Sequence, residues 1–353
     1  MSRAAEPRPG LRDVEPYVSP QIQVPVRLNT NEMPRPLPDG FADDLAEAVR
    51  SLPLNRYPDG QMTRLREELA ARVGQPFEGT WAANGSNEIL TELLLAYGGP
   101  GRTAVVFEPT YPLHARLARL TSTHLVSPTI PAPFTITDRA IGEAVAADPD
   151  VVFVCSPNNP TGNAQPLEAT RALAETVDAL VIVDEAYVEF GGESALKLVA
   201  DHPNVVVTRT LSKAFALAGA RVGYCLAAPE VVRDLQRVRL PYHMSALTQT
   251  AGIAALRHAA DALALLDAIR AQRDRIVDAL GAMPGLTVFP SDANFVLFTP
   301  PPERGAAEIW QALLDRGILI RDLTSVVPRA LRVTAGTEDE TTQFLDALTE
   351  VLA

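Results

Sequence analysis

The chain has only two lysines, and one of them lies where an amine could take part in chemistry. All but Lys197 and Lys213 of its 31 basic residues are arginines. An arginine guanidinium stays protonated and cannot act as an amine nucleophile, so arginine replaces lysine only as a surface charge. Lys197, in Ser194-Ala195-Leu196-Lys197-Leu198, fits a solvated helix face. Lys213 is therefore the candidate nucleophile.

Polar segments follow three short apolar runs in the middle of the chain. Each run has the length and the β-branched composition of a buried strand. Ligands of open α/β sheets bind just beyond the carboxyl ends of the strands, so these polar segments are expected in one crevice. The runs and their polar segments are Val151–Cys155 with Ser156–Gly162, Leu180–Val183 with Asp184–Tyr187, and Val205–Thr208 with Thr210–Lys213, followed by Gly219–Arg221.

These segments supply the groups that pyridoxal phosphate needs. Lys213 is suited to form a Schiff base with the cofactor aldehyde, because cationic neighbours lower the pKa of an amine. Asp184 is suited to pair with the protonated pyridine nitrogen and keep the ring an electron sink. Asn159 and Tyr187 are suited to hydrogen-bond the phenolic oxygen of the ring.

The phosphate of such a cofactor also has expected partners. Arg221 and the hydroxyls of Thr210 and Ser212 suit an anion. Asn84-Gly85-Ser86-Asn87 opens a predicted helix, and a helix N-terminus presents free N–H groups to an anion. Charge-assisted hydrogen bonds contribute roughly 1.5–3 kcal/mol each, so four or five of them would retain the cofactor without covalent help.

Each of these pieces also has a purely structural interpretation. Alone, Asp184 would be a helix cap, Tyr187 a packed aromatic residue, and Asn-Pro-Thr-Gly a turn. The pieces occur together and in order, each after a predicted buried strand. That joint occurrence favours the functional interpretation.

The elements that position these residues indicate an α/β fold with a mostly parallel sheet sandwiched by helices, followed by a smaller α+β unit. Strands apolar on both faces and separated by helices are typical of parallel sheets. The predicted strands of the large sheet are Thr103–Phe107, the three runs above and Val222–Leu226; the predicted helices before it are Phe41–Leu52, Met62–Val73 and Glu88–Tyr97.

The pattern changes after Pro241. A helical stretch over Ser245–Ala282 precedes strands at Thr287–Phe289, Asn294–Phe298, Ile318–Ile320 and Leu331–Thr334, with helices at Ala306–Arg316 and Asp339–Leu352. The chain is thus divided into a proline-rich arm (1–44) that contributes to the small domain and to a dimer contact, a large cofactor-binding domain (45–244) and a small domain (245–353).

Composition narrows the function classes. The net charge of −12 disfavours nucleic acid as a partner. No apolar stretch is long enough for a membrane span, and residues 1–20 lack the apolar core of an export signal. Cys155 and Cys225, both in apolar runs, favour neither a disulfide nor a metal site, which indicates the cytoplasm. The five histidines lack metal-ligand spacing, so no metal site is predicted and no histidine is given a role.

The sequence resembles the fold-type-I aminotransferases, and within them the histidinol-phosphate branch. The resemblance covers nearly the whole chain, from Pro16-Tyr17 to Leu331–Gly336. Asn-Pro-Thr-Gly and Ser212-Lys213 mark the superfamily, and Leu28–Glu32 and Arg56–Asp59 point to the branch. The most specific pieces are Leu28–Glu32, Arg56–Asp59, Ala83–Glu88, Asp184–Tyr187 and Ser212–Gly219.

The resemblance implies a role for each matching residue. Lys213 bears the cofactor, Asp184 meets its ring nitrogen, and Asn159 and Tyr187 meet its phenolic oxygen, with Tyr111 stacked on the ring. Tyr57 reaches the cofactor phosphate from the other subunit of a homodimer, so that active sites are shared. The groups around the phosphate are Ser86, Asn87, Thr210, Ser212 and Arg221; those for the substrate are Arg332, which binds its anion, and Arg321 and Tyr17, near its phosphate.

The implied reaction is transamination between histidinol phosphate and 2-oxoglutarate in histidine biosynthesis. Two departures from the family pattern concern substrate preference: Asn31-Glu32-Met33-Pro34 replaces Asn-Glu-Asn-Pro, and Pro112-Leu113-His114 lacks a common second aromatic residue. The alternatives are an aromatic amino-acid aminotransferase, a decarboxylase of a phosphorylated amino acid, a cofactor-binding regulator, for which the sequence offers no DNA-binding module, and a cofactor-free structural protein.

Overall fold

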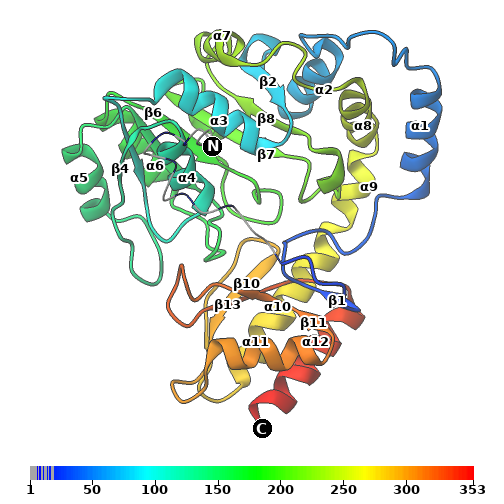
Figure 1. The fold of residues 1–353 in the computed structure, drawn as a ribbon, viewed down its shortest axis with the longest axis vertical. Helices are drawn as coiled ribbons and strands as arrows, with labels where there is room; N and C mark the ends of the chain where they lie inside the picture. Colours follow the sequence, from blue (N-terminus) through cyan, green and yellow to red (C-terminus); the bar gives the residue numbers. More distant parts are fainter. Residues whose placement is uncertain (1–5, 7, 9–10, 12–13, 15, 17–19) are drawn as a thin grey trace, which may run out of the picture.

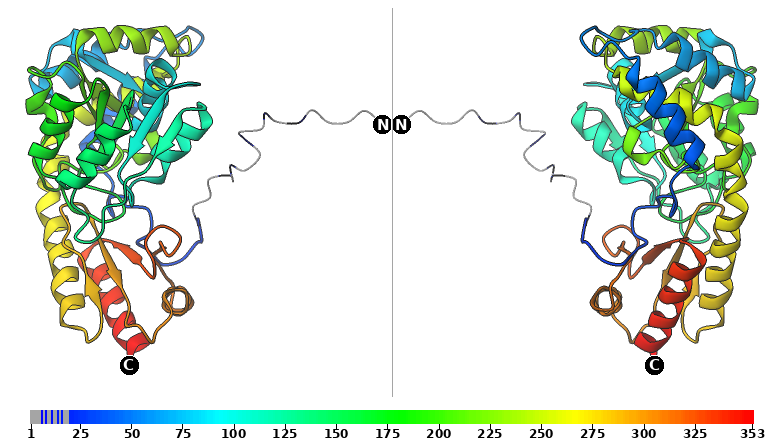
Figure 2. Two further views of the ribbon diagram at one scale, coloured as in Figure 1. Left: turned by 90° about the vertical axis from the view of Figure 1, so that its left-hand side faces the viewer. Right: turned by 90° about the vertical axis from the view of Figure 1, so that its right-hand side faces the viewer.

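The computed structural model describes residues 6, 8, 11, 14, 16 and 20–353. Figure 1 shows a larger upper part built on a twisted sheet and a smaller lower part built on short strands. A run of helices descends along one side of the molecule and joins the two parts, as the side views in Figure 2 make plain. Two bodies connected in this way leave room for a ligand where they meet.

The larger part contains a seven-stranded sheet. From β7 to β4 all neighbouring strands run parallel, while β8 runs antiparallel to both β7 and β2. The predicted mostly parallel sheet is thereby confirmed. The strands across the sheet are β2 Thr80–Ala83, β8 Gly223–Leu226, β7 Val205–Thr210, β6 Leu180–Asp184, β5 Val151–Cys155, β3 Thr103–Val106 and β4 His124–Val126.

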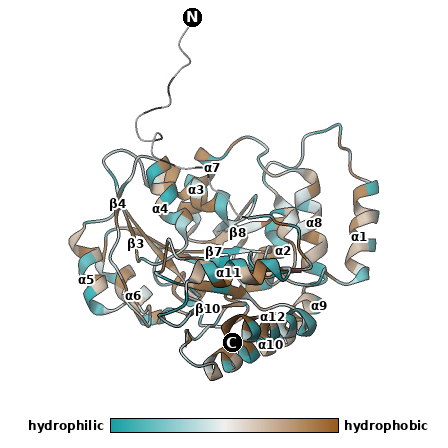
Figure 3. Ribbon diagram, turned by 60° about the horizontal axis from the view of Figure 1, so that its bottom comes forward, coloured by the Kyte–Doolittle hydropathy of each residue, from teal (hydrophilic) through white to brown (hydrophobic). Residues whose placement is uncertain are grey.

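The central strands are apolar on both faces, and β5 and β6 are buried along their whole length. Helices cover the sheet: α3 packs on β7 and β8, and α6 packs on β6. Figure 3 shows α5 and α10 with hydrophilic and hydrophobic residues on the same helix, the pattern of a helix with one face on a core. The helices of this part are α1 Asp39–Arg50, α2 Thr63–Val73, α3 Ser86–Tyr97, α4 Pro112–Leu120, α5 Asp138–Ala146, α6 Leu167–Thr176 and α7 Pro229–Val238.

The smaller part is α+β, as predicted. A four-stranded antiparallel sheet has the order β12-β13-β10-β9, and β1 pairs in parallel with β11 beside it. The N-terminal segment therefore lies against the last third of the chain (Figure 1). The elements are β1 Val26–Arg27, β9 Thr287–Val288, β10 Phe295–Thr299, β11 Ile318–Leu319, β12 Arg321–Asp322, β13 Leu331–Thr334, α11 Ala306–Asp315 and α12 Glu338–Leu352.

The helical stretch predicted over Ser245–Ala282 is broken into three helices: α8 Ala246–Arg257, α9 Ala259–Ala264 and α10 Leu266–Ala282. The first break falls at His258, which has neither proline nor glycine beside it. Its ring nitrogen contacts the carboxylate of Asp44 on α1 at 2.8 Å, and its other nitrogen contacts Asp261 at 3.3 Å. A tertiary contact therefore interrupts a helix that the local pattern would continue.

Among the residues that the structure describes, none of the helices has both the length and the apolar composition needed to cross a membrane.

Candidate active site

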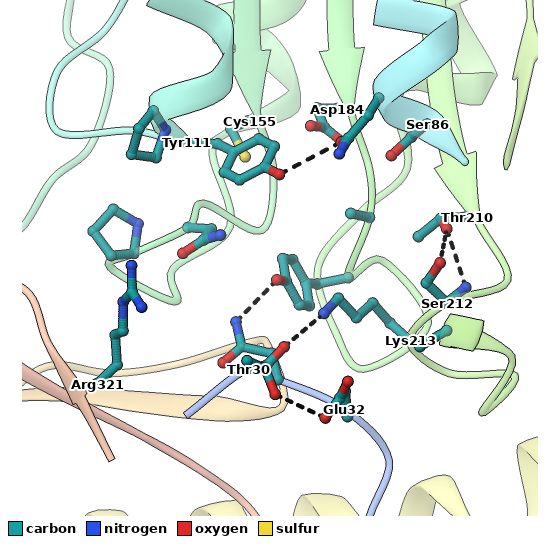
Figure 4. Close-up of a pocket in the computed structure, with 18 of the residues that line it drawn as sticks. Thr30, Glu32, Ser86, Tyr111, Cys155, Asp184, Thr210, Ser212, Lys213 and Arg321 are labelled. Carbon is teal, nitrogen blue, oxygen red and sulfur yellow. Dashed lines mark hydrogen bonds between the residues drawn. The ribbon is translucent and has the colours of Figure 1, made fainter. Parts of the chain in front are cut away.

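A cavity of about 370 Å³ opens where the two parts meet. Its upper wall comes from the carboxyl ends of β5, β6 and β7 and from the start of α3, as expected for an open α/β sheet. The lower wall comes from residues 29–32 and from β12 and β13 (Figure 4). The predicted residues that line the cavity are Ser86, Asn87, Tyr111, Asn159, Asp184, Tyr187, Thr210, Ser212, Lys213, Arg221, Arg321 and Arg332.

Lys213 lies in the loop after β7 with its amine in the cavity. Its Nζ donates a hydrogen bond to the backbone oxygen of Thr30 at 2.9 Å (Figure 4). Burial, followed by the positive charges of Arg332 and Arg221, lowers the pKa of this amine to about 7, and Glu32 opposes part of that shift. A substantial fraction of the amine is therefore neutral and nucleophilic near pH 7.

Asp184 ends β6 and is 2% exposed. Its Oδ2 lies 3.1 Å from Nε2 of His114, and the Thr208 hydroxyl lies 3.5 Å from its Oδ1. His114 belongs to α4, is fully buried, and stacks on Phe153 with ring centroids 4.7 Å apart. The sequence analysis gave His114 no role, so this contact with the predicted cofactor carboxylate corrects that interpretation.

Tyr187 and Asn159 face the cavity from neighbouring strand ends. The Tyr187 oxygen accepts a hydrogen bond from Nδ2 of Asn31 at 2.9 Å. The Asn159 side-chain oxygen accepts one from the guanidinium of Arg332, whose other nitrogen donates to the Asn29 backbone oxygen at 3.1 Å. Arg332, the predicted substrate arginine, is therefore held between the large sheet and the N-terminal segment.

The groups predicted for the cofactor phosphate gather at the start of α3. The Thr210 hydroxyl donates to Ser212 at 2.9 Å, and Nη1 of Arg221 donates to the same Ser212 oxygen at 3.2 Å. Gly85, just before α3, has φ +81°, and a Cβ there would lie 2.5 Å from Nη2 of Arg221. Glycine is thus required for the guanidinium to lie against this helix N-terminus.

The three remaining predicted residues, Tyr57, Arg321 and Tyr17, differ in where they lie. Tyr57 lies outside the cavity of its own chain: it is 80% exposed and stacks on Tyr242 with ring centroids 4.5 Å apart. Arg321 extends from β12 into the cavity (Figure 4). Tyr17 lies outside the described residues.

The cavity also contains residues that the strand-end pattern did not point to. Asn29, Thr30, Asn31 and Glu32 form its lower wall, and Cys155 lies between Tyr111 and Asp184 in Figure 4. In the sequence, residues 29–32 stood out only as part of a family motif. No local pattern could place them beside Lys213, because more than 150 residues separate them from it.

The donor set fits pyridoxal phosphate. A primary amine of lowered pKa, a buried carboxylate, an amide, a phenol and an anion-binding helix N-terminus all open into one cavity. Each group of the cofactor has a partner of matching chemistry among them. The residues present are therefore those that this cofactor requires.

A second polar cluster joins two residues of α3 to His243, which lies between α7 and α8, and none of its residues lines the cavity. The possible ligand atoms of Glu88, Glu92 and His243 lie within 4.8 Å of one another. Both carboxylates have internal partners, since the Trp81 indole donates to Glu92 at 2.9 Å and the Asn84 amide donates to Glu88 at 2.6 Å. These bonds account for the cluster structurally.

Comparison with known proteins identifies similar chains. The family model "aminotransferase class I and II" matches residues 24–348. Histidinol-phosphate aminotransferase of Frankia casuarinae is 49% identical, covering 98% of this chain and 90% of that protein. The enzyme of the same name from Thermobifida fusca is 48% identical over 97% of this chain and 94% of that protein.

A solved structure has the same fold. The histidinol-phosphate aminotransferase of Sinorhizobium meliloti, in complex with pyridoxal-5'-phosphate, aligns with a TM-score of 0.87 and 24% identity. The alignment covers 100% of this chain and 99% of that chain. The predicted fold type is thereby confirmed.

Proposed function

The chain belongs to the class I and II aminotransferases, as its sequence predicted, and we propose that it transfers the amino group of histidinol phosphate to 2-oxoglutarate, giving imidazole-acetol phosphate and glutamate in histidine biosynthesis. It is a pyridoxal-phosphate-dependent enzyme. The observation that carries the proposal is the pairing, in one cavity, of the Lys213 amine with the two substrate-side guanidiniums of Arg332 and Arg321.

The chain's own residues hold the cofactor. Lys213 binds its aldehyde carbon, Asp184 its ring nitrogen, and Asn159 and Tyr187 its phenolic oxygen, with Tyr111 against the ring. Ser86, Asn87, Thr210, Ser212 and Arg221 hold its phosphate. When bound, the cofactor supplies an electron sink that makes the proton on the amine-bearing substrate carbon acidic.

His114 supports Asp184 in that role. The carboxylate stays useful as a partner of the ring nitrogen only if it is ionised and correctly oriented. Nε2 of His114 lies 3.1 Å from Oδ2 and, when it carries the ring hydrogen, donates to it and fixes the orientation of the carboxylate. Oδ1, 3.5 Å from the Thr208 hydroxyl, would then be left to hold the ring nitrogen.

Lys213 would also move the proton. Its Nζ, which lies in the cavity, would take the proton from the substrate carbon as a base and give it back as an acid. A pKa of about 7 suits both directions of transfer, because an acid–base group works best when its pKa lies near the operating pH. The Thr30 backbone oxygen, 2.9 Å from Nζ, holds the amine on the cavity side of its loop.

Two guanidiniums serve the two anions of the reaction. Histidinol phosphate carries a phosphate ester, whereas 2-oxoglutarate carries carboxylates, so the site must accept both. A guanidinium can donate two parallel hydrogen bonds to a phosphate or to a carboxylate. Arg332, 7% exposed and fixed by Asn159 and Asn29, is the anchor, and Arg321 on the neighbouring strand extends the positive surface toward the mouth of the cavity.

The chain is proposed to act as a homodimer with shared sites in the cytoplasm. Several of the large exposed apolar residues lie in two segments, at Leu54 and Tyr57 and at Leu240, Tyr242 and Leu247, which the Tyr57–Tyr242 stack joins. Burial of such a patch stabilises a subunit contact.

The two cysteines, both buried and free, favour a reducing compartment. The division into residues 1–44, 45–244 and 245–353 is supported by the β1–β11 pairing.

Substrate half-reactions test the proposed activity. The pyridoxal form of the enzyme should lose its lysine-bound absorbance much faster with histidinol phosphate than with phenylalanine at equal concentration. A preference for phenylalanine would favour the aromatic aminotransferase instead. Release of carbon dioxide from a phosphorylated amino acid, without amino transfer, would favour the decarboxylase.

A further inference from the structure

Asn31 has a backbone conformation that few residues adopt. Its φ is +56°, in the left-handed region, where asparagine is among the few side chains tolerated. The residue is 1% exposed and lies in the N-terminal segment between β1 and α1. A buried residue held in this conformation directs its side chain away from the path of the strand that precedes it.

Four hydrogen bonds fix Asn31. Its backbone N–H donates to the Thr334 hydroxyl at 3.1 Å, and that hydroxyl donates to Oδ1 of Asn31, also at 3.1 Å. The Asn294 amide donates to the Asn31 backbone oxygen at 3.1 Å. The fourth bond runs from Nδ2 of Asn31 to the Tyr187 oxygen at 2.9 Å.

These bonds determine which way the Asn31 amide faces. The Thr334 oxygen accepts from a backbone N–H, which is always a donor, so its own hydrogen is left to donate. That hydrogen is donated to Oδ1, the atom of the Asn31 amide that lies beside it. The NH₂ group then faces Tyr187, and the orientation of the amide follows from the hydrogen-bond network.

A phenol that accepts one hydrogen bond still has its own hydrogen to donate. Because Nδ2 of Asn31 occupies the Tyr187 oxygen as a donor, the phenol hydrogen must point elsewhere. We propose that Asn31 is a positioning residue that turns the Tyr187 hydrogen into the cavity, toward the phenolic oxygen of the cofactor. The inference rests on the proposed function, which assigns that oxygen to Tyr187.

The same network connects the cofactor side of the cavity to the substrate side. Thr334 and Arg332 lie two residues apart on β13, so their side chains are on the same face of the strand. Arg332 in turn donates to the Asn29 oxygen, two residues before Asn31. Asn31 thus links the Tyr187 hydroxyl, through Thr334, to the strand that carries the substrate arginine.

The pH at which the cofactor absorbance changes provides the test. That pH reports the proton shared between the Lys213 nitrogen and the cofactor oxygen. A donor to the oxygen disperses its negative charge and lowers the midpoint. Among the described residues, the charged groups that face Tyr187 and Lys213 are Asp184 on β6, Arg332 on β13, Arg221 after β7 and Glu32 beside Asn31, and the variants leave all of them in place.

Two variants of Asn31 separate orientation from packing. Asn31→Gly keeps the left-handed backbone without strain and removes the amide. Asn31→Asp keeps the shape and the bond from Thr334, but turns an accepting oxygen toward Tyr187, which draws the phenol hydrogen out of the cavity. Absorbance titration of the holoenzyme should show a midpoint about one pH unit higher in Asn31→Gly, and higher still in Asn31→Asp.

The control is the same pair of substitutions in a Tyr187→Phe background, where Asn31 has no hydroxyl to orient. There Asn31→Gly should not move the midpoint further, and Asn31→Asp should move it only by the smaller amount that its added negative charge produces. A shift of equal size in both backgrounds, or an unchanged midpoint with the hydroxyl present, overturns the proposal. If Asn31→Gly does not fold, as thermal unfolding of the apoprotein would reveal, Asn31→Asp decides the question by the same two outcomes. An unsubstituted protein without a lysine-bound cofactor absorbance would instead refute the proposed function.

Discussion

The two lysines of the chain have opposite environments, and that contrast defines the site at the scale of single residues. Lys197 lies in a short 3₁₀ helix, Ala195–Leu198, and its side chain is 67% exposed, as the sequence predicted, and ion-paired with Glu193 at 2.7 Å. Lys213 has its amine in the cavity, where burial and two arginines lower its pKa to about 7. One amine is a surface charge and the other is a nucleophile.

Substitution of each lysine tests this contrast. Lys213→Ala removes the only amine in the cavity, so the purified protein should lose its lysine-bound cofactor colour and nearly all turnover. Lys197→Ala should leave both unchanged, since an exposed ion pair contributes at most about 1 kcal/mol to stability. Absorbance spectra and steady-state rates measure both. Retained turnover in Lys213→Ala would refute the catalytic assignment.

The lowered pKa of Lys213 predicts how cofactor capture depends on pH. The neutral amine is the reactive form, so the rate at which apoprotein captures pyridoxal phosphate should rise with pH through about 7 and level off above it. Glu32 raises the pKa of Lys213, so Glu32→Gln should move the midpoint to lower pH. Stopped-flow absorbance gives both midpoints, and their difference cancels the titration of the cofactor itself. A midpoint that moves upward would contradict the assigned electrostatics.

The sequence predicted the residues that lie at strand ends and missed those that reach the cavity from elsewhere. Lys213, Asp184 and Tyr187 follow apolar runs, so a local pattern indicates them. His114 lies within α4, where its distance to Asp184 depends on how that helix packs. Asn31 reaches Tyr187 across 156 positions of sequence, which no local pattern encodes.

At the scale of elements, the N-terminus of α3 matters most. In the proposed function, its N–H groups, the Arg221 guanidinium and the Thr210 and Ser212 hydroxyls form the site for the cofactor phosphate. Gly85 permits the close approach of Arg221 because it has no Cβ. The geometry of a single turn before the helix therefore decides how well a phosphate is bound.

Two glycine substitutions separate backbone strain from loss of this site. Gly74 and Gly85 both have positive φ, but a Cβ at Gly74 would meet nothing within 4 Å, whereas one at Gly85 would meet Arg221. Alanine should cost about 1–2 kcal/mol of stability through strain at Gly74, which is left-handed, and more at Gly85, whose φ of 81° and ψ of 162° lie in a region that is essentially restricted to glycine. Only Gly85→Ala should also weaken binding of pyridoxal phosphate, by roughly tenfold or more. Equal affinities in equilibrium titrations of the two apoproteins would contradict the anion site.

The prediction of elements was accurate for the longer apolar runs and incomplete elsewhere. β5 and β13 have the predicted bounds, because a continuous apolar run between polar residues leaves little choice. The buried strand β2, only four residues long, was not predicted, and neither were the helices α4, α5, α6 and α7. Segments of 4 to 10 residues give a weak periodic signal, although α11, of the same length, was predicted.

At the scale of the whole molecule, the cavity exists because the N-terminal segment pairs with β11 of the smaller part. β1 is parallel to β11, and residues 29–32 continue from β1 across the cavity floor. Tyr57, predicted to reach a cofactor phosphate, is instead exposed on its own chain beside Tyr242. That position suits a residue that acts in a neighbouring copy.

Mixing inactive chains tests whether the sites are shared. A dimer of one Tyr57→Phe chain and one Lys213→Ala chain has one site with both native residues if Tyr57 acts across the interface. Random mixing should therefore restore up to about a quarter of the unsubstituted activity. A chain carrying both substitutions, mixed with Tyr57→Phe, should restore nothing. Absence of rescue, once mass spectrometry has shown that mixed dimers form, would argue against a shared site.

Because the chain has only two lysines, chemical labelling of their amines can measure how much of the enzyme carries its cofactor. An acylating label has one accessible side-chain target, Lys197, whose extent of modification serves as an internal standard. Lys213 becomes a second target only in molecules whose amine is not already bonded to the cofactor. The ratio of label at the two positions, measured by peptide mapping, therefore counts the fraction of unloaded enzyme in any preparation, without reference to colour or turnover.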